Sequence, residues 1–348
     1  MTPTGEENGV PGLRVHMVCG EDPDSWILGK FAKNLVSELE HLGVHASLGR
    51  SPDPAADINH YVIFLDYRGE SHGHTTLMVT HVDDFARLAR LKKGLETAAL
   101  AICMSRQTVA QLQAVGLPED KLCYVNPAHD GAIKPRTTVI GLTTRLYDDG
   151  RKKEQWIEKL SSIIDPADFS FRIMGEGWEP IVASLGRLGF QVDYDAAFDR
   201  EKYRALMGAI DAYLYLGEDE GSMGYIDALA AGVATIVAPQ GFHLDVEDGI
   251  THRVESFTDL VDAFDAMVED KNKRARAVAG WTWECYAKRH LAIWRAVVAA
   301  EPLPASSRAT EPGSGVAAVR WKFLRHTLWR RRRRLKRKLL RLKARLMG

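Results

Sequence analysis

The sequence has little of what marks several specialised classes of protein. Only four of its 348 residues are cysteine, and they stand far apart without a C-x-x-C pair. This excludes a disulfide framework or a cysteine-based zinc site and indicates buried thiols in a reducing compartment. No run of eighteen apolar residues occurs, so we predict no membrane-spanning helix. The opening MTPTGEENGVPG lacks a basic region followed by an apolar one, and we predict no signal peptide.

Acidic residues are missing from the last part of the chain. From Val316 onward there are fourteen Lys and Arg and no Asp or Glu. The whole chain carries 46 basic and 46 acidic residues, so the body is acidic and the tail strongly basic. This separation of charge predicts an anionic partner for the tail.

Short β-rich runs alternate with amphipathic helical patterns along most of the chain. LRVHMVCG precedes DSWILGKFAKNLVSELEHLG, and TTVIGLTT later precedes RKKEQWIEKLSSII. Such alternation is typical of parallel sheets covered by helices on both faces. We therefore expect the α/β class, with two Rossmann-like domains facing a cleft. The expected segments are a polar leader (1–12), an N-terminal acceptor-side domain (13–135), a C-terminal donor-binding domain with a crossing helix (136–300), a Pro- and Ser-rich flexible linker (301–316) and a basic tail (317–348).

The stretch EDEGSMGYIDALAAG, residues 218–232, joins a predicted strand to a predicted helix. Its turn residues Gly221, Ser222 and Gly224 leave backbone N–H groups accessible at the helix start, which suits a phosphate. Glu220 and Asp227 flank the turn, and carboxylates there would suit the hydroxyls of a ribose or a sugar. The alternative is that Asp227 only complements the helix dipole and Glu220 is solvated.

EDEGSMGYIDALAAGVATIVAP resembles the donor-site signature of GT-B glycosyltransferases, especially the large retaining family 4. In that signature two acids precede a run of small residues, and the second acid corresponds to Asp227. The first is either Asp219, which keeps the family spacing, or Glu220, which precedes the matching Gly221; we favour Glu220. The resemblance extends over about residues 13–299 and implies the GT-B fold.

Two further stretches support this resemblance. VIGLTTRLYDDGRKKEQWI resembles the first loop of the donor domain, which implies that Arg145 and Lys152 hold the donor diphosphate. Two cations suit a pyrophosphate leaving group, although a solvated basic cluster at a helix start is a common alternative. FRIMGEGW resembles the G-x-G turn of the family, which implies that Gly175 and Gly177 line the nucleotide pocket.

The remaining candidates are a glycine and several histidines. Gly29 stands where family members bring a glycine-rich loop near the donor phosphates. His81, in THVDDF, is the leading acceptor-side residue, although a structural histidine is an equal alternative. His243, in GFHLD, is expected to approach the transferred sugar or its phosphates. His72 and His74 have metal-like spacing but fit a loop, and the resemblance implies neither a bound metal nor a cofactor beyond the donor substrate.

Together these features predict a glycosyltransferase that moves a sugar from a UDP- or GDP-type nucleotide sugar to a saccharide or lipid-linked acceptor. The resemblance implies a role in cell-surface polysaccharide or glycolipid biosynthesis. Glu220 and His81 are the candidate catalytic residues. Retaining members of the resembled family lack an obvious carboxylate nucleophile, and none stands out here, so the resemblance implies retention by front-face attack. Inversion would need His81 or Asp83 as general base. The alternative is a non-catalytic nucleotide-sugar-binding or scaffold protein with this fold.

The basic tail carries one apolar stripe at helical spacing. The stripe consists of Trp321, Leu324, Leu328, Leu335, Leu339, Leu342 and Leu346. A cationic helix of this kind suits an anionic membrane surface. Nucleic-acid binding would explain the cations but not the regular leucines. A coiled-coil partner is a third possibility. We expect a cytoplasmic protein attached peripherally to the inner face of the cell membrane through residues 317–348, with no nucleic-acid partner.

Overall fold

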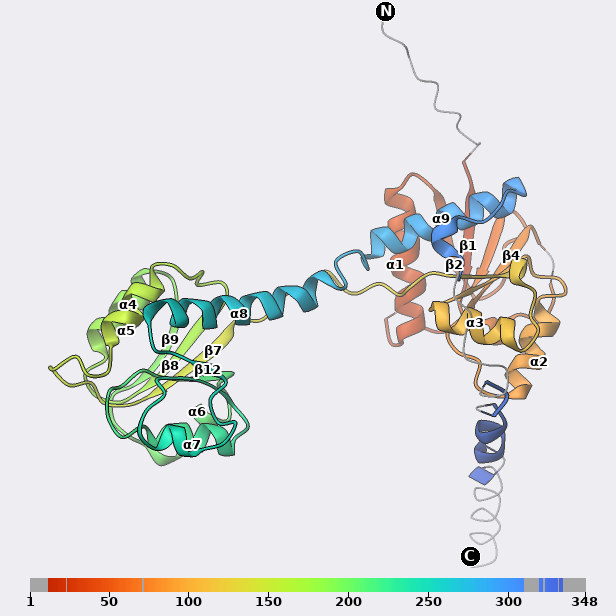
Figure 1. Ribbon diagram of the computed structural model, residues 1–348. Coiled ribbons are helices and arrows are strands. Elements are labelled where there is room, and N and C mark those ends of the chain that lie inside the picture. The colour runs from red at the N-terminus through yellow and green to blue at the C-terminus, as the bar shows by residue number, and fades with distance from the viewer. Residues whose placement is uncertain are drawn as a thin grey trace, which may run out of the picture. The chain divides into compact units, whose positions relative to one another are not determined.

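The computed structural model describes residues 12–22, 24–70, 72–309, 319–321, 323–330 and 332–333. The chain forms two units, drawn in Figure 1. Unit 1 comprises Met1–Gly131 together with Val278–Gly348, and unit 2 comprises Ala132–Ala277. Unit 2 is therefore inserted within the sequence of unit 1.

Unit 1 is built on a six-stranded parallel sheet with the order β2-β1-β3-β4-β5-β6. The strands are β1 (Arg14–Val18), β2 (His45–Gly49), β3 (Ile58–Tyr61), β4 (His74–Val79), β5 (Leu100–Cys103) and β6 (Leu122–Tyr124). The helices are α1 (Ile27–His41), α2 (Phe85–Gly94), α3 (Arg106–Ala114) and α9 (Trp283–Ala299), with short 3-10 helices η1 (Phe64–Asp66), η2 (Glu119–Lys121) and η4 (Ala305–Ser307).

Successive residues of the strands of unit 1 point into two different cores. Along β5, Leu100 and Ile102 belong to the core covered by α1 and α9, whereas Ala101 and Cys103 belong to the core covered by α2 and α3. This is the period of two expected of a strand. Because both faces are buried, the strand reads as an unbroken apolar run, as parallel sheets require.

Unit 2 repeats the architecture with a parallel sheet of order β12-β11-β10-β7-β8-β9. Its strands are β7 (Thr138–Thr143), β8 (Phe169–Met174), β9 (Gln191–Asp195), β10 (Ala212–Tyr215), β11 (Ala234–Val237) and β12 (His252–Arg253). Its helices are α4 (Glu154–Ser161), α5 (Glu179–Arg187), α6 (Arg200–Met207), α7 (Met223–Ala230) and α8 (Phe257–Arg276), with the 3-10 helix η3 (Gly241–Asp245). The prediction of two Rossmann-like α/β domains with parallel sheets is confirmed.

Helix α9 corrects one predicted boundary. The sequence placed residues up to 300 with the donor-binding domain, but residues from Val278 onward belong to unit 1. The reason is apolar packing: Tyr286, Leu291 and Trp294 of α9 are buried in the same core as α1. The indole Nε1 of Trp294 also donates a hydrogen bond to Thr76 Oγ1 of β4 (3.1 Å).

The ends of the chain are described in part. Residues 301–309 of the expected linker include η4, and Ser307 there is buried. The residues described between 319 and 333 are helical, and we call them the tail helix. The leader up to residue 11 and the rest of the predicted tail lie outside the described residues. Among the helices of the described part, none is long and apolar enough to cross a membrane.

Candidate functional site

A pocket of about 540 Å³ lies at the carboxyl ends of β7 and β8 and at the start of α7, within unit 2. Parallel α/β sheets bind ligands at this edge, where strands lead into helices. The pocket is lined by Thr143, Thr144, Arg145, Met174, Gly175, Glu176, Ala196, Phe198, Tyr203, Ser222, Met223, Gly224 and Asp227. The structure therefore brings together Arg145, Gly175, Ser222, Gly224 and Asp227, which the sequence named from three separate motifs.

The N-terminus of α7 supplies free hydrogen-bond donors to this pocket. Ser222 is the N-cap residue, but its hydroxyl bonds the Tyr213 hydroxyl (2.7 Å) and not the helix. Within the described residues, the backbone N–H groups of Met223 and Gly224 have no hydrogen-bond partner. A helix start with unpaired N–H groups and a positive dipole end attracts an anion.

Gly224 allows α7 to begin this close to the sheet. A Cβ at Gly224 would stand 2.3 Å from Thr143 Oγ1 and 2.4 Å from the Tyr213 hydroxyl. The glycine is thus required by the close approach of helix and strand, and it keeps the free N–H groups at the pocket.

Gly175 has a similar role on the opposite side of the pocket. Its φ of +140° lies in a region that favours glycine, and a Cβ there would stand 2.2 Å from the Thr144 carbonyl oxygen. The neighbouring Gly177 also has a positive φ, but it packs against Leu146 and does not line the pocket. The G-x-G turn thus contributes one lining glycine and one that shapes the loop behind it.

Arg145 is the cation of the pocket. Its guanidinium is 3.1 Å from Glu176 Oε2, and both side chains are more than 60% exposed. An ion pair this exposed contributes about 0–1 kcal/mol, so Arg145 can leave Glu176 for a ligand at little cost. It is free to serve an anion in the way that the sequence predicts.

Lys152 is held very differently. Its side chain is only 8% exposed, and its Nζ donates to Asp219 Oδ2 and to the Tyr215 hydroxyl, both at 2.5 Å. Lys152 does not line the pocket at α7. It joins the loop after β7 to the loop after β10 and so holds both sides of the site in place.

Asp219 organises the glycine turn from beneath. Besides Lys152 it accepts hydrogen bonds from the Tyr215 hydroxyl (2.6 Å) and the Gly221 N–H (3.2 Å). Partial burial would raise the pKa of Asp219, but the hydrogen bonds from Lys152 and Tyr215 outweigh it and lower the pKa. Glu220, by contrast, is exposed, and its backbone carbonyl accepts from the Phe242 N–H (3.1 Å). The two candidate first acids therefore have separate roles: one is committed to the turn and one is open to solvent.

His243 lies under the turn and not at the pocket. It is fully buried, its Nε2 accepts the Ser222 N–H (3.0 Å), and its Nδ1 is 3.0 Å from the Ala238 carbonyl oxygen. Because Nε2 accepts, Nδ1 must carry the proton and donate to Ala238. Burial lowers the pKa of His243 and keeps this tautomer neutral, although the Ala238 hydrogen bond works the other way. Its role in the structure is to position Ser222 and the start of α7.

Two aromatic residues of the pocket were missed by the sequence interpretation. Phe198 lines it with a 71% exposed side chain, and Tyr203 lies beside it with ring centroids 5.5 Å apart. The Tyr203 hydroxyl donates to Asp227 Oδ2 (2.5 Å). Burial and the neighbouring carboxylate raise the pKa of Tyr203. The one feature of the sequence that could have indicated an aromatic pocket residue is Phe198 itself, an apolar residue in the polar loop before α6.

The predicted acceptor-side residues lie in unit 1, after β4. His81 Nε2 contacts the Arg87 guanidinium, which also donates to Asp83 Oδ1 (3.1 Å). Burial and the charge of Arg87 lower the pKa of His81. Arg330 of the tail helix donates to Asp83 Oδ2 (2.7 Å) and is 3.2 Å from Asp84.

Gly29 also belongs to unit 1, where it is buried in the first turn of α1. Its neighbour Lys30 pairs with Asp130 (2.9 Å). Gly29 therefore lies inside a helix and not in a glycine-rich loop.

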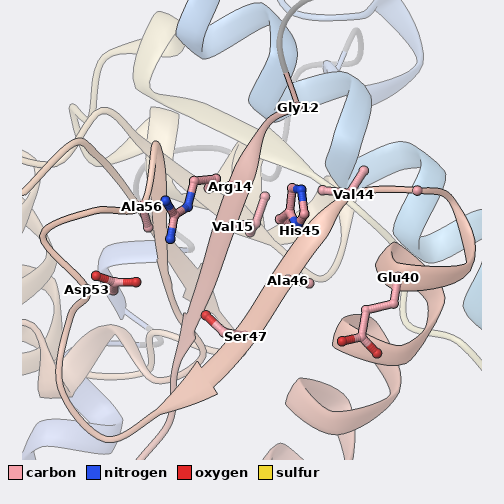
Figure 2. Close-up of a pocket in the computed structure, with 11 residues that line it drawn as sticks. Gly12, Arg14, Val15, Glu40, Val44, His45, Ala46, Ser47, Asp53 and Ala56 are labelled. Carbon is pink, nitrogen blue, oxygen red and sulfur yellow. The ribbon is translucent and has the colours of Figure 1, made fainter.

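A larger cavity of about 890 Å³ lies at the outer strand of unit 1 (Figure 2). Figure 2 shows Arg14 and Asp53 on one side of β1, and Glu40 on α1 beyond β2. These charged groups do not converge on one point, and the cavity borders an edge strand and not the carboxyl ends of the sheet. The pocket at α7 is therefore the better candidate.

No protein-family model and no curated protein matches the sequence. Among solved structures, the chain is similar to Anabaena HepE in complex with UDP-glucose, at 11% identity and a TM-score of 0.34, covering 90% of this chain and 99% of that one. It is also similar to the lipopolysaccharide outer core galactosyltransferase WaaB, at 12% identity and a TM-score of 0.33 over 83% and 99% of the two chains. The catalytic domain of the Helicobacter pylori cholesterol-α-glucosyltransferase is 18% identical with a TM-score of 0.32, covering 45% of this chain and 98% of that domain.

Proposed function

We propose that unit 2 binds a nucleotide-activated sugar and that the protein transfers this sugar to a saccharide or lipid-linked acceptor. The observation that carries the proposal is the combination in one pocket of free N–H groups at α7, the exposed Arg145, and Asp227 beside Tyr203. The first two suit phosphates, and the carboxylate suits the hydroxyls of a ribose.

The charge of the pocket favours a nucleotide over a bare phosphate. Arg145 is outnumbered by two lining acids, Glu176 and Asp227. A diphosphate alone is therefore attracted only weakly, and the rest of the ligand must add binding energy. Phe198 and Tyr203 offer exposed aromatic surface for a nucleobase, and base–aromatic stacking contributes about 1–3 kcal/mol.

The chemistry follows from these roles. The bond between the sugar's anomeric carbon and the diphosphate oxygen breaks, while a bond forms to the acceptor oxygen on the same face. The acceptor proton passes to the departing phosphate oxygen, and Arg145 with the α7 N–H groups stabilises the developing negative charge. The route needs no metal and retains the configuration at the anomeric carbon. We propose that His81 contacts the acceptor and that Glu220 contacts the transferred sugar. The proposed setting is the assembly of cell-surface polysaccharide or glycolipid.

A thermal-shift series tests the binding step. We expect UDP or GDP to stabilise the protein by about 2.7 kcal/mol at a hundred times the dissociation constant, and pyrophosphate to shift it far less. Arg145→Ala should lose most of the shift. Arg274→Ala is the matched control, because Arg274 is an exposed arginine with a weak ion pair on α8. No shift with any nucleoside diphosphate would overturn the proposal.

The alternative function is a non-catalytic nucleotide-sugar-binding or scaffold protein. The specific observation in its favour is that Lys152 is committed to Asp219, which leaves Arg145 as the cation lining the described pocket. Release of labelled sugar from UDP- or GDP-sugars separates the two. An enzyme shows transfer or slow hydrolysis that Arg145→Ala reduces by about a hundredfold or more, whereas a binding protein shifts in melting temperature without releasing sugar.

A further inference from the structure

The tail helix has one face buried against unit 1. Val319 and Phe323 are 2% and 0% exposed and belong to the core covered by α2 and α3. The Phe323 ring meets that of Phe85 edge-on, with centroids 5.9 Å apart. Thr327 Oγ1 accepts the Phe85 N–H (3.4 Å), so three successive turns of the tail helix contact unit 1.

Arg330 completes this face with charge. It donates to Asp83 Oδ2 (2.7 Å), its Nε is 3.2 Å from Asp84 Oδ2, and its side chain is 30% exposed. Partial burial would raise the pKa of Asp83, but the Arg330 hydrogen bond and the charge of Arg87 lower it. The tail helix is thus fixed at the carboxyl end of β4 by apolar and ionic contacts.

A second, apolar face of the same helix has nothing packed against it within the described residues. Trp321, Leu324 and Leu328 are 64%, 41% and 49% exposed. At about 100° per residue these three side chains point away from Val319, Phe323 and Arg330. The sequence continues the stripe in the same phase at Leu335, Leu339, Leu342 and Leu346, beyond the described residues.

The charges beside this apolar face indicate which class of partner it binds. The exposed residues Arg320, Arg325 and Arg332 flank the stripe, and the chain from Val316 onward has fourteen basic residues and no acid. A helix partner in a coiled coil normally meets both signs of charge at the flanks. An apolar stripe between rows of cations instead matches a bilayer interface with anionic headgroups, where each cation contributes about 1 kcal/mol.

We propose that the docked tail helix is a membrane-binding surface that orients unit 1 on an anionic bilayer. Trp321, Leu324 and Leu328 enter the interface, while Phe323 and Arg330 keep the helix attached to the protein. The end of β4 with His81 and Asp83 is thereby held next to the membrane. Only the use of that edge for a lipid-linked acceptor rests on the proposed function.

Flotation of the full chain tests the surface. We expect binding to vesicles containing phosphatidylglycerol and little binding to pure phosphatidylcholine vesicles. Leu324→Glu with Leu328→Glu should weaken binding at least about tenfold. Ile163→Glu with Leu188→Glu is the matched control, because these are also exposed apolar residues, in unit 2, and it should bind like the natural chain. Equal flotation of both double variants, or a natural chain that binds RNA but not vesicles, would overturn the proposal.

Hydrogen exchange tests the orientation. In the natural chain, vesicles should slow exchange both in the tail helix and in residues 81–90. Phe323→Ala with Arg330→Met should still float, because the stripe is intact, but protection should be confined to the tail. Protection of residues 81–90 that survives in this variant would overturn the role of the docked face. Neither readout needs catalysis, so the proposed function could fail while this proposal stands.

Discussion

The two units present the same edge of a parallel sheet in opposite states. In unit 2 the edge holds a pocket with an exposed arginine and with N–H groups that are unpaired within the described part of the chain. In unit 1 the corresponding groups after β4 are already satisfied: Asp83 is bound by Arg87 and by Arg330 of the tail helix. The same architecture thus carries an exposed arginine in one unit and carboxylates paired with arginines of the chain itself in the other.

The largest effect is expected from closing the open edge. Gly175→Ala places a Cβ against the Thr144 carbonyl at a φ of +140°, which costs a few kcal/mol locally. Nucleotide affinity, measured by calorimetry, should fall about a hundredfold. Gly186→Ala is the control, because that glycine lies in α5 with open space around it and should gain stability. Unchanged affinity in Gly175→Ala would contradict the pocket assignment.

The interior of unit 1 should make its stability depend on pH. His60 and His290 are fully buried, and their Nε2 atoms have no hydrogen-bond partner among the residues that the structure describes. Burial lowers the pKa of His290 to about 4 and that of His60 well below its usual value. The unfolded histidines take up protons first, so stability is retained above about pH 6.5 and falls below it by about 1.4 kcal/mol per pH unit for each histidine.

Hydrogen exchange of α9 amides at pH 7.5 and 5.5 measures this loss. The variant His290→Leu should halve the difference between the two pH values, because one titrating group is removed. If the free energy of opening obtained from exchange in α9 is the same at both pH values, the pH dependence does not come from these histidines.

A smaller effect is expected from the ion pair between Lys152 and Asp219 in unit 2. Lys152→Met leaves Asp219 ionised with only the Tyr215 and Gly221 donors. Urea unfolding of unit 2 should show a loss of about 2 kcal/mol, less than a fully buried pair would give. The double variant Lys152→Met with Asp219→Asn should recover part of the loss. Strict additivity of the two changes would show that the pair is not coupled.

The smallest effect is expected in unit 1, at the carboxyl end of β4, where Arg330 contacts Asp83. Arg330→Met removes one cation near His81 and Asp83, so the pKa values of both groups should rise toward their ordinary values. Titration of the His81 ring by NMR measures the shift. Arg325→Met, an exposed cation of the same helix, should leave the titration unchanged; an equal shift in both variants would point to a general charge effect.

Local sequence was enough to predict the sheets, because buried parallel strands such as β5 read as plain apolar runs. It was also enough to bring Gly175 and Gly224 to the pocket, since one follows a strand end and the other begins a helix, together with Asp227, which lies one turn further along the same helix α7. It could not show that Lys152 is committed to Asp219, because that contact joins two loops 67 residues apart.

Phe198 and Tyr203 were missed because neither stands in a motif, and their ring contact depends on how the loop before α6 folds. His243 was named from the sequence, but its place beneath the turn could not be predicted, because η3 brings its ring to the Ser222 N–H from 21 residues further along the chain. In the tail, counting leucines identified the exposed stripe but passed over Phe323, which lies out of phase with it and faces unit 1.

The insertion of unit 2 within unit 1 has a consequence for synthesis on the ribosome. Unit 1 needs Trp294 and its neighbours in α9 to cover one face of its sheet, and these are made only after all of Ala132–Ala277. At about 5–20 residues per second, roughly 7–30 seconds pass before α9 is made. By the end of that interval unit 2 has its whole sequence and can fold, while the first strands of unit 1 have waited with an uncovered apolar face. Chaperones would therefore be needed most by the half of the protein that is translated first.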